Sequence, residues 1–247
     1  VVNLTSENFL RAINEYGATG IDATTTYVLQ EDIDVSKLGD IEGMFGSANT
    51  PFAGTFDGNG HTISNLNMAW TGDTYANSST LYAGLFGYTD GATIKNLHIS
   101  GAYNVEVLES DELVIGGFIG QANNTTIENC YITSSMSVDV IKGFNEDNEA
   151  VAGNFNMLTY GGLVGQMKYS TLVNSIVRPT STVNFHLSNV YRTTSVIGGV
   201  VGNLNSSSVR FVLGAQSLNV NIDENYNGST YIGGIAGYTY SSTSITN

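Results

Sequence analysis

The stretch "IGGFIGQANNTTIENCYIT" (residues 115–133) holds the pattern that decides the fold. Glycines bracket a short apolar run, polar residues follow, and an Ile-x-Asn triplet leads to further apolar residues. Ile127 and Asn129 share one strand parity, whereas Cys130 and Ile132 share the other. The alternation therefore slips by one residue after Asn129, as a strand requires if it turns a corner and keeps its apolar side chains inside.

The same pattern recurs along the whole chain. Its copies begin at residues 52, 82, 115, 160, 197 and 232, which are 30 to 45 residues apart. A constant core of 19 residues thus alternates with insertions of variable length, and the largest insertion is expected at 134–159. Self-similarity at such a period is the signature of a solenoid.

Short strands and recurring corners indicate coils stacked in parallel, with neighbouring strands about 4.8 Å apart. No segment after residue 16 has the pattern of a long helix. Parallel crossover connections are overwhelmingly right-handed. The sequence therefore predicts an all-β fold, a right-handed parallel β-helix (β-solenoid) of about six rungs, with a short N-terminal helical cap.

Asparagine suits the corners because it tolerates a left-handed backbone and its amide can bond to an asparagine stacked above or below. The aligned copies predict structural corner residues at Asn65, Asn96, Asn129 and Asn174. Two copies depart from the pattern. Phe211 replaces the asparagine in one, and in the last copy Asn247 arrives one residue late, so distortion is expected in those two rungs.

The N-terminal segment reads as a cap. Residues 4–17 predict a helix with Thr5 or Ser6 as N-cap and with Phe9, Leu10 and Ile13 on one face. A strand is expected over 24–36, with Tyr27 and Leu29 on one face. The predicted domains are residues 1–51, cap and leading strand, and residues 52–247, the repeat array, as one continuous domain.

The other end of the chain stops inside a repeat. An exposed last rung offers unpaired backbone groups and apolar edge residues to another chain. Two alternatives follow: the native protein continues, or this end docks on a partner such as a second copy. Because the chain starts at Val1 and shows no signal peptide, we expect a processed or excised segment of a longer precursor.

The composition limits which classes of partner the chain can bind. The net charge is −14, and only 12% of residues are charged. The eight lysines and arginines are scattered singly, so nucleic acid is not expected as a partner, because backbone binding requires clustered cations. No apolar run approaches the length of a membrane span, so no membrane insertion is expected. The single cysteine excludes an internal disulfide.

The glycine motifs carry a family resemblance. Each is followed by a Thr/Ser-rich strand, and they read "GLFG" (84–87), "GFIG" (117–120), "GLVG" (162–165), "GVVG" (199–202) and "GIAG" (234–237). This array resembles the GLUG repeats of large bacterial surface and secreted proteins, and "FAGTFDGNGHTISNL" (52–66) looks like the segment that often precedes them. The resemblance implies a β-solenoid stalk or adhesive region and no catalytic residues within the repeats.

Candidate chemistry is sparse. The glycine segments lack the lysine of a phosphate loop, so neither a nucleotide nor any other cofactor is expected. Cys130 falls in a core column, which favours a buried structural thiol over a nucleophile. His61, His98 and His186 lie in three different rungs, so a zinc site is not expected. We predict no catalytic residues.

Carboxylates gather in the expected insertions. Solvated loop charge is the favoured interpretation, with weak calcium binding and catalysis by paired carboxylates as alternatives. The weak calcium candidates are Asp111, Glu112, Glu146 and Asp147. Glycosylation sequons occur about as often as chance predicts, at Asn3, Asn77, Asn123, Asn124, Asn205 and Asn227.

These patterns favour a non-catalytic structural or adhesive protein, extracellular or attached to the cell surface. It would be a rigid stalk or fibre subunit that stacks end to end, or that contacts glycans or proteins of a host or matrix. The alternative is a carbohydrate-binding or carbohydrate-cleaving β-helix. A groove lined by carboxylates and aromatic residues from successive rungs would favour that alternative.

Overall fold

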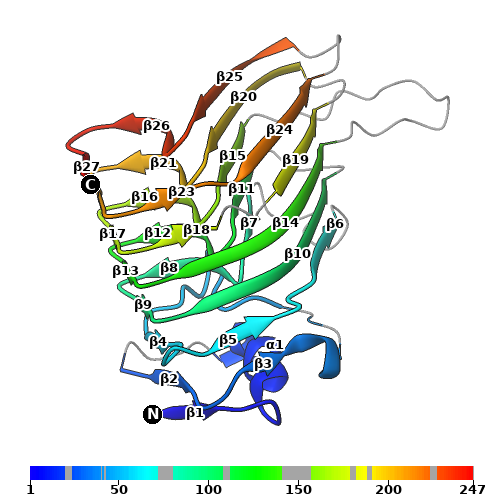
Figure 1. Cartoon of the computed structure of the whole chain (residues 1–247), viewed down its shortest axis with the longest axis vertical. Coiled ribbons are helices and arrows are strands. Elements are labelled where there is room, and N and C mark those ends of the chain that lie inside the picture. The colour runs from blue at the N-terminus through cyan, green and yellow to red at the C-terminus, as the bar shows by residue number, and fades with distance from the viewer. Residues whose placement is uncertain are drawn as a thin grey trace, which may run out of the picture.

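The computed structural model of residues 1–247 folds as a parallel β-solenoid (Figure 1). The structure is described for residues 1–19, 24–39, 41, 43–71, 80–107, 112–140, 157–178, 182–187, 191–222 and 227–246. All pairs between its strands are parallel, and the strands form four sheets, here named A to D. The predicted fold class, an all-β parallel β-helix with a helical cap, is confirmed.

Sheet A contains one three- or four-residue strand from each turn of the solenoid. Its order is β1 (Val2–Leu4), β2 (Thr26–Leu29), β4 (Thr55–Asp57), β9 (Thr93–Lys95), β13 (Thr126–Glu128), β17 (Thr171–Val173), β22 (Ser208–Arg210) and β27 (Ser244–Thr246). The last six strands belong to the six repeat copies. The cap contributes the first two, of which β1 was not expected from the sequence.

Sheet B follows sheet A around each rung. Its main order is β3 (Ile33–Asp34), β5 (Thr62–Ser64), β10 (His98–Val107), β14 (Tyr131–Val140), β18 (Ile176–Val177) and β23 (Leu213–Gly214). Three further strands extend this sheet. They are β6 (Met68–Thr71), which pairs with the second half of β10, β19 (Thr182–Leu187), which pairs with the second half of β14, and β24 (Ser217–Ile222), which pairs with β19.

Sheets D and C complete the rung and meet at the glycine motif. Sheet D comprises β7 (Thr80–Ala83), β11 (Glu112–Gly116), β15 (Met157–Gly161), β20 (Tyr191–Gly198) and β25 (Asn227–Gly233). Sheet C comprises β8 (Phe86–Asp90), β12 (Ile119–Asn123), β16 (Val164–Lys168), β21 (Val201–Asn205) and β26 (Ala236–Tyr240).

The described parts of the predicted insertions contain strands, including both ends of the insertion expected at 134–159. Strand β14 continues through 134–140 and β15 already begins at Met157, so only 141–156 lies outside the described residues. The side chains of Met136 and Val138 are buried, and β14 pairs along its length with β10. Alternating apolar residues thus extend the core between sheets B and D, well beyond the 19-residue repeat.

The cap closes the N-terminal end as predicted. Helix α1 (Phe9–Thr19) begins a few residues later than the expected N-cap, and Phe9 and Ile13 are fully buried. The predicted strand over 24–36 is confirmed by β2 and β3, which are followed by the 3-10 helix η1 (Val35–Lys37). Tyr27 and Leu29 face the core as expected.

Four strands of sheet A, β9, β13, β17 and β22, are each flanked by two corners with left-handed backbone. After the strands, Asn96, Asn129 and Asn174 have φ of 53°, 54° and 49°. Phe211 has a φ of 51° in the same column, so the expected distortion of its rung does not occur at this corner. A second column of residues with positive φ lies just before the strands of sheet A and contains Gly91, Asn124, Tyr169, Ser206 and Ser241. Asn247 lies outside the described residues.

Asn65 is not equivalent to the other corner asparagines, which corrects the sequence alignment. It has a left-handed φ of 55°, but Thr55 pairs with Thr93, and Thr62 pairs with His98. The corner of that rung is therefore the turn 57–60, and Asn65 lies at a later bend, where its amide donates to Asp34 Oδ1 at 2.9 Å. The segments "TISNL" (62–66) and "TIKNL" (93–97) are nearly identical, but they do not pair with each other. Strand pairing, and not local similarity, sets the register.

Replacing Phe211 with asparagine is expected to stabilise the protein by about 1 kcal/mol, since a bulky L-residue pays a cost of that order in the left-handed region. The ring is 60% exposed, so little packing is lost. Urea denaturation of Phe211→Asn and of a Phe211→Ala control tests this. An asparagine variant no more stable than the alanine variant would contradict it.

Candidate functional site

Cys130 occupies the interior, in the same column as Leu97 and Ser175. Its backbone N–H donates to Ser175 Oγ at 3.1 Å, and its thiol lies 3.4 Å from the Glu128 carbonyl oxygen. Burial raises the pKa of the thiol to about 12. This placement provides no thiolate at neutral pH.

We expect native Cys130 to resist alkylation by iodoacetamide at pH 8, because the buried thiol stays protonated there. Mass spectrometry should detect labelling only after denaturation. Complete labelling of the native protein within minutes would overturn the structural role.

The other predicted positions do not assemble into a metal site. No group of three or more His, Cys, Asp or Glu side chains that could hold a metal is found within the described residues. Glu112 lies on β11 and accepts a hydrogen bond from Thr80 Oγ1 at 3.0 Å. Its three companion calcium candidates, Asp111, Glu146 and Asp147, lie outside the described residues, as does the sequon residue Asn77.

The remaining sequon side chains differ in accessibility. Asn3 is exposed and accepts from Gln30 Nε2 at 3.1 Å, and exposed Asn124 donates to Asp90 Oδ1 at 2.8 Å. Asn123 is half-buried and donates to the Tyr88 hydroxyl at 2.7 Å, which occupies the nitrogen that a glycan would need. Asn205 is half-buried, and Asn227 lies on β25, where no side-chain position is described.

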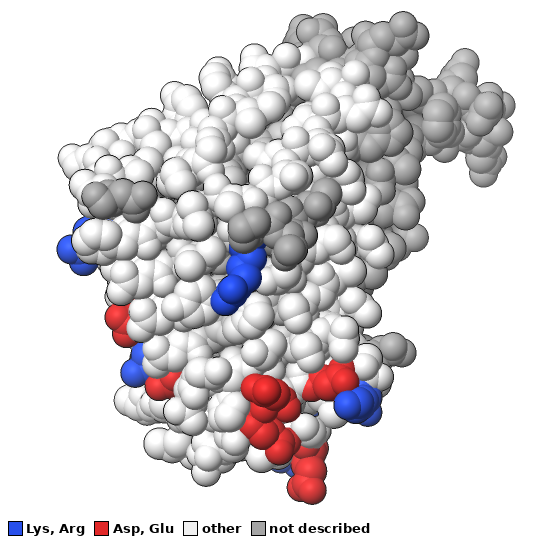
Figure 2. Space-filling view, in the orientation of Figure 1, with Lys and Arg blue, Asp and Glu red and all other residues white. Residues whose placement is uncertain are grey.

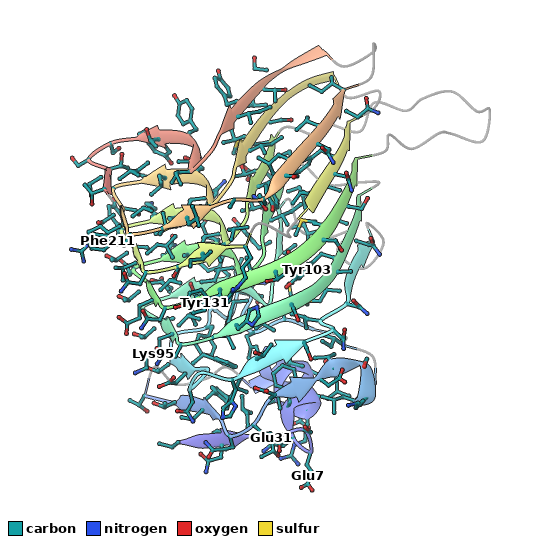
Figure 3. All side chains as sticks on the ribbon, viewed as in Figure 1. Glu7, Glu31, Lys95, Tyr103, Tyr131 and Phe211 are labelled. Carbon is teal, nitrogen blue, oxygen red and sulfur yellow. The ribbon has the colours of Figure 1, made fainter. Side chains whose placement is uncertain are left out.

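Charge is distributed unevenly along the solenoid axis. Acidic groups gather at the N-terminal end, where Glu7 and Glu31 lie (Figures 2 and 3). Asp34 is held there by Lys37 Nζ at 2.9 Å. Among the side chains described from residue 157 onward, the formally charged ones are Lys168, Arg178 and Arg210, all basic. The described carboxylates therefore do not line a groove across successive rungs.

A pocket lies at the corner between sheets A and B. It has a volume of about 290 Å³ and is lined by Gly60, Asn96, Leu97, His98, Asn129 and Tyr131. These residues come from three successive rungs, because His98 on β10 pairs with Thr62 on one side and with Tyr131 on the other. The outward positions just after each corner thus place the His98 imidazole beside Tyr131, its partner on the neighbouring strand; Figure 3 labels Tyr131.

His98 is fixed in this wall. Its Nδ1 lies 3.3 Å from Thr62 Oγ1 and its Nε2 lies 3.4 Å from Thr133 Oγ1. Partial burial, together with the Arg178 charge, lowers the pKa of His98, and the Asp32 charge only partly opposes this. The imidazole is therefore neutral at pH 7. His61 lies one rung below, where its Nδ1 is 3.2 Å from Asp32 Oδ1.

The amide side of the pocket is a hydrogen-bonded chain. Asn129 Nδ2 donates to Asn96 Oδ1 at 3.1 Å, and Asn96 Nδ2 donates to Asp57 Oδ1 at 3.0 Å. Lys95 Nζ lies 3.4 Å from Asp57 Oδ2. Burial would raise the pKa of Asp57, but its hydrogen bonds and the Lys95 charge hold it below its usual value. Asn129 Oδ1 accepts no hydrogen bond within the described part of the chain.

A cation lies beside the pocket. The Arg178 guanidinium carbon is 5.5 Å from the centroid of the Tyr131 ring, in a cation–π contact. Arg178 is exposed, and no carboxylate of the described residues lies within 4.0 Å of it. The sequence pointed to His98 only as one of three histidines in different rungs, and it did not point to Tyr131 or Arg178. The repeated outward parity after each corner was the signal that could have found them.

Comparison with known proteins gives limited likeness. No family model matches the chain. Halomucin from Haloquadratum walsbyi is 42% identical over 108 residues, which is 42% of this chain. The chain spans about 1% of the length of that relative.

One solved structure, provisionally assigned as an immunoglobulin A1 protease from Bacteroides ovatus, is 15% identical. The alignment covers 96% of this chain and 83% of that one, with a TM-score of 0.38. This likeness is too low to support an argument about fold or function. In the described part of the chain, no helix has the length and hydropathy needed to cross a membrane.

Proposed function

We propose that this chain is a non-catalytic, extracellular structural module: a rigid β-solenoid of a stalk or fibre that stacks end to end through its last rung. The low share of charged residues, 12%, and the GLUG-like repeats support an extracellular role. The likeness to halomucin, whose name marks it as mucin-like, supports it as well. Parallel strands paired from rung to rung make the module stiff along its axis without a metal or a disulfide.

The exposed last rung is the observation that carries the stacking proposal. Ile245 on β27 is paired with fully buried Val209, and Ile232 on β25 is paired with fully buried Ile197, yet these two side chains are 45% and 57% exposed. Tyr238 on β26 is 45% exposed as well. The two isoleucines at core positions thus form an apolar surface that a further rung, of this chain or of a second copy, would cover.

The two edge strands of sheet A favour a second copy joined head to tail. The described part of the last rung, residues 211–222 and 227–246, contains no charged residue, and the nearest described cation is Arg210. The opposite end carries Glu7, Glu31 and Asp34, and its β1 has a free edge beside Val2, which is 37% exposed. Pairing β27 of one copy with β1 of the next would continue sheet A, and no described charge of the last rung would repel the acidic end.

Negative-stain microscopy of the full chain over a range of concentrations tests this proposal. Filaments with a repeat of one solenoid length are expected, and Ile245→Asp should abolish them without changing the stability of the monomer. Thr246→Asp is the matched control, because it places the same charge on the outer face of the same strand. Short rods at every concentration, or filaments that survive Ile245→Asp, would overturn stacking.

A further inference from the structure

We infer that the corner pocket of sheet B, together with Arg178, is a binding site for a carboxylate-bearing pyranose, a uronic acid unit of a polysaccharide. The proposed function assigns the chain a structural role and leaves this surface unused. The site therefore goes beyond that function, and it does not depend on stacking, because it lies on the side of the solenoid and stacking uses the last rung.

The volume of the pocket is large enough for one sugar ring. Its volume of about 290 Å³ is at the lower limit of the roughly 300–1,000 Å³ that encloses a drug-sized ligand. The pocket is open to solvent, so a longer chain could continue out of it while one unit sits inside. Gly60 leaves one wall without a side chain, since a Cβ there would meet nothing within 4 Å.

The lining supplies both kinds of contact that a pyranose offers. The rings of Tyr131 and His98 provide flat apolar surface with polar edges for the C–H face of a sugar. Asn129 Oδ1 accepts no hydrogen bond from the described residues and can accept one from a hydroxyl, and its position is fixed by the bond from Asn129 Nδ2 to Asn96. His98 is neutral, so this side of the pocket is polar but uncharged and can hydrogen-bond to sugar hydroxyl groups.

Arg178 adds the preference for an anion. A guanidinium forms charge-assisted, bidentate bonds with a carboxylate, and these are about twice as strong as neutral hydrogen bonds. Tyr131 holds Arg178 in place through the cation–π contact. On a chain with net charge −14, a preorganised arginine with no described carboxylate partner is a specific feature, because general attraction of anions is not expected from the overall charge.

Titration calorimetry with tetramers of galacturonate, glucuronate and mannuronate, each beside its neutral counterpart, tests the site. At least one uronate tetramer is expected to bind about tenfold tighter than its neutral counterpart. Arg178→Gln should remove that preference and leave the weaker neutral binding. Tyr131→Ala should weaken both by tenfold or more, since a ring–sugar stack and the support of Arg178 are lost together.

The chain offers a matched control in Lys168 and Tyr169. Lys168 Nζ lies 5.3 Å from the Tyr169 ring centroid, so the pair repeats the cation–π contact, but it does not line the pocket. Tyr169→Ala should leave saccharide binding unchanged. Three results would each overturn the site: no uronate tetramer binds better than its neutral counterpart, binding survives Tyr131→Ala, or Tyr169→Ala weakens it equally. Filament formation in the same samples reports separately on the proposed function.

Discussion

Replacing Gly162 with alanine is expected to destabilise the protein by about 3 kcal/mol or more, because the new methyl group has no space between rungs. A Cβ at this position would overlap the Gly199 carbonyl oxygen of the next rung, and it would lie 2.8 Å from Val177 Cγ2. A backbone oxygen cannot rotate away as a side chain can, so relief requires that two paired rungs separate. Urea unfolding measured by circular dichroism checks the loss.

Gly234 provides the matched control for this prediction. It occupies the same position in the last rung, where a Cβ would meet nothing within 4 Å. Gly234→Ala should therefore leave the stability of the monomer unchanged, or raise it by about 0.5 kcal/mol through the lower entropy of the unfolded chain. Equal destabilisation by both substitutions would mean that rung spacing is not what requires glycine here.

Replacing Phe86 with alanine is expected to cost about 3–5 kcal/mol, the range found for fully buried phenylalanines. Its ring centroid lies 5.4 Å from that of Phe45, 5.2 Å from Phe52 and 5.4 Å from Phe56. These four rings, with Tyr27 and Phe9 beside them, join the cap to the first repeats. Thermal and urea unfolding of the variant should therefore show a large loss of stability.

Two controls separate packing from a general effect of losing an aromatic ring. Phe86→Leu keeps most of the apolar volume and should cost clearly less than Phe86→Ala. Phe211→Ala removes an exposed ring at the solenoid edge and should change stability by less than about 0.5 kcal/mol. A Phe86→Ala variant as stable as Phe211→Ala would contradict the role of the aromatic cluster.

Much of the architecture could be predicted because the repeat constrains it at several positions at once. The parity slip after Asn129, the glycine pair before it and the apolar residues around it all favour the same corner. The same reasoning identified the cap, since Phe9 and Ile13 share a helical face, and placed Cys130 in the core. Each inference depends on residues close together in the chain, where the period of a strand or helix is readable.

The candidate site could not be predicted in the same way. Its lining combines Gly60, Asn96 and Tyr131 from three rungs, and the first of these comes from the copy that was misaligned. Sequence similarity placed Asn65 at the corner, whereas the paired strands place the turn 57–60 there. Because the first copy was misaligned, the sequence assigned the wrong neighbours to Asn96 and His98, and the pocket could not be recognised.

The sequence by itself determined that the chain is a β-solenoid with about six repeats, asparagine-rich corners, a helical cap and a buried cysteine. Only the tertiary structure decided that strands of sheets B and D extend into the described parts of the insertions, and that Tyr131, His98 and Arg178 meet outside the corner. The physical reason is that alternation specifies which face of a strand is buried but not which strand lies beside it. Partner and register are fixed by packing between residues some 30 or more positions apart.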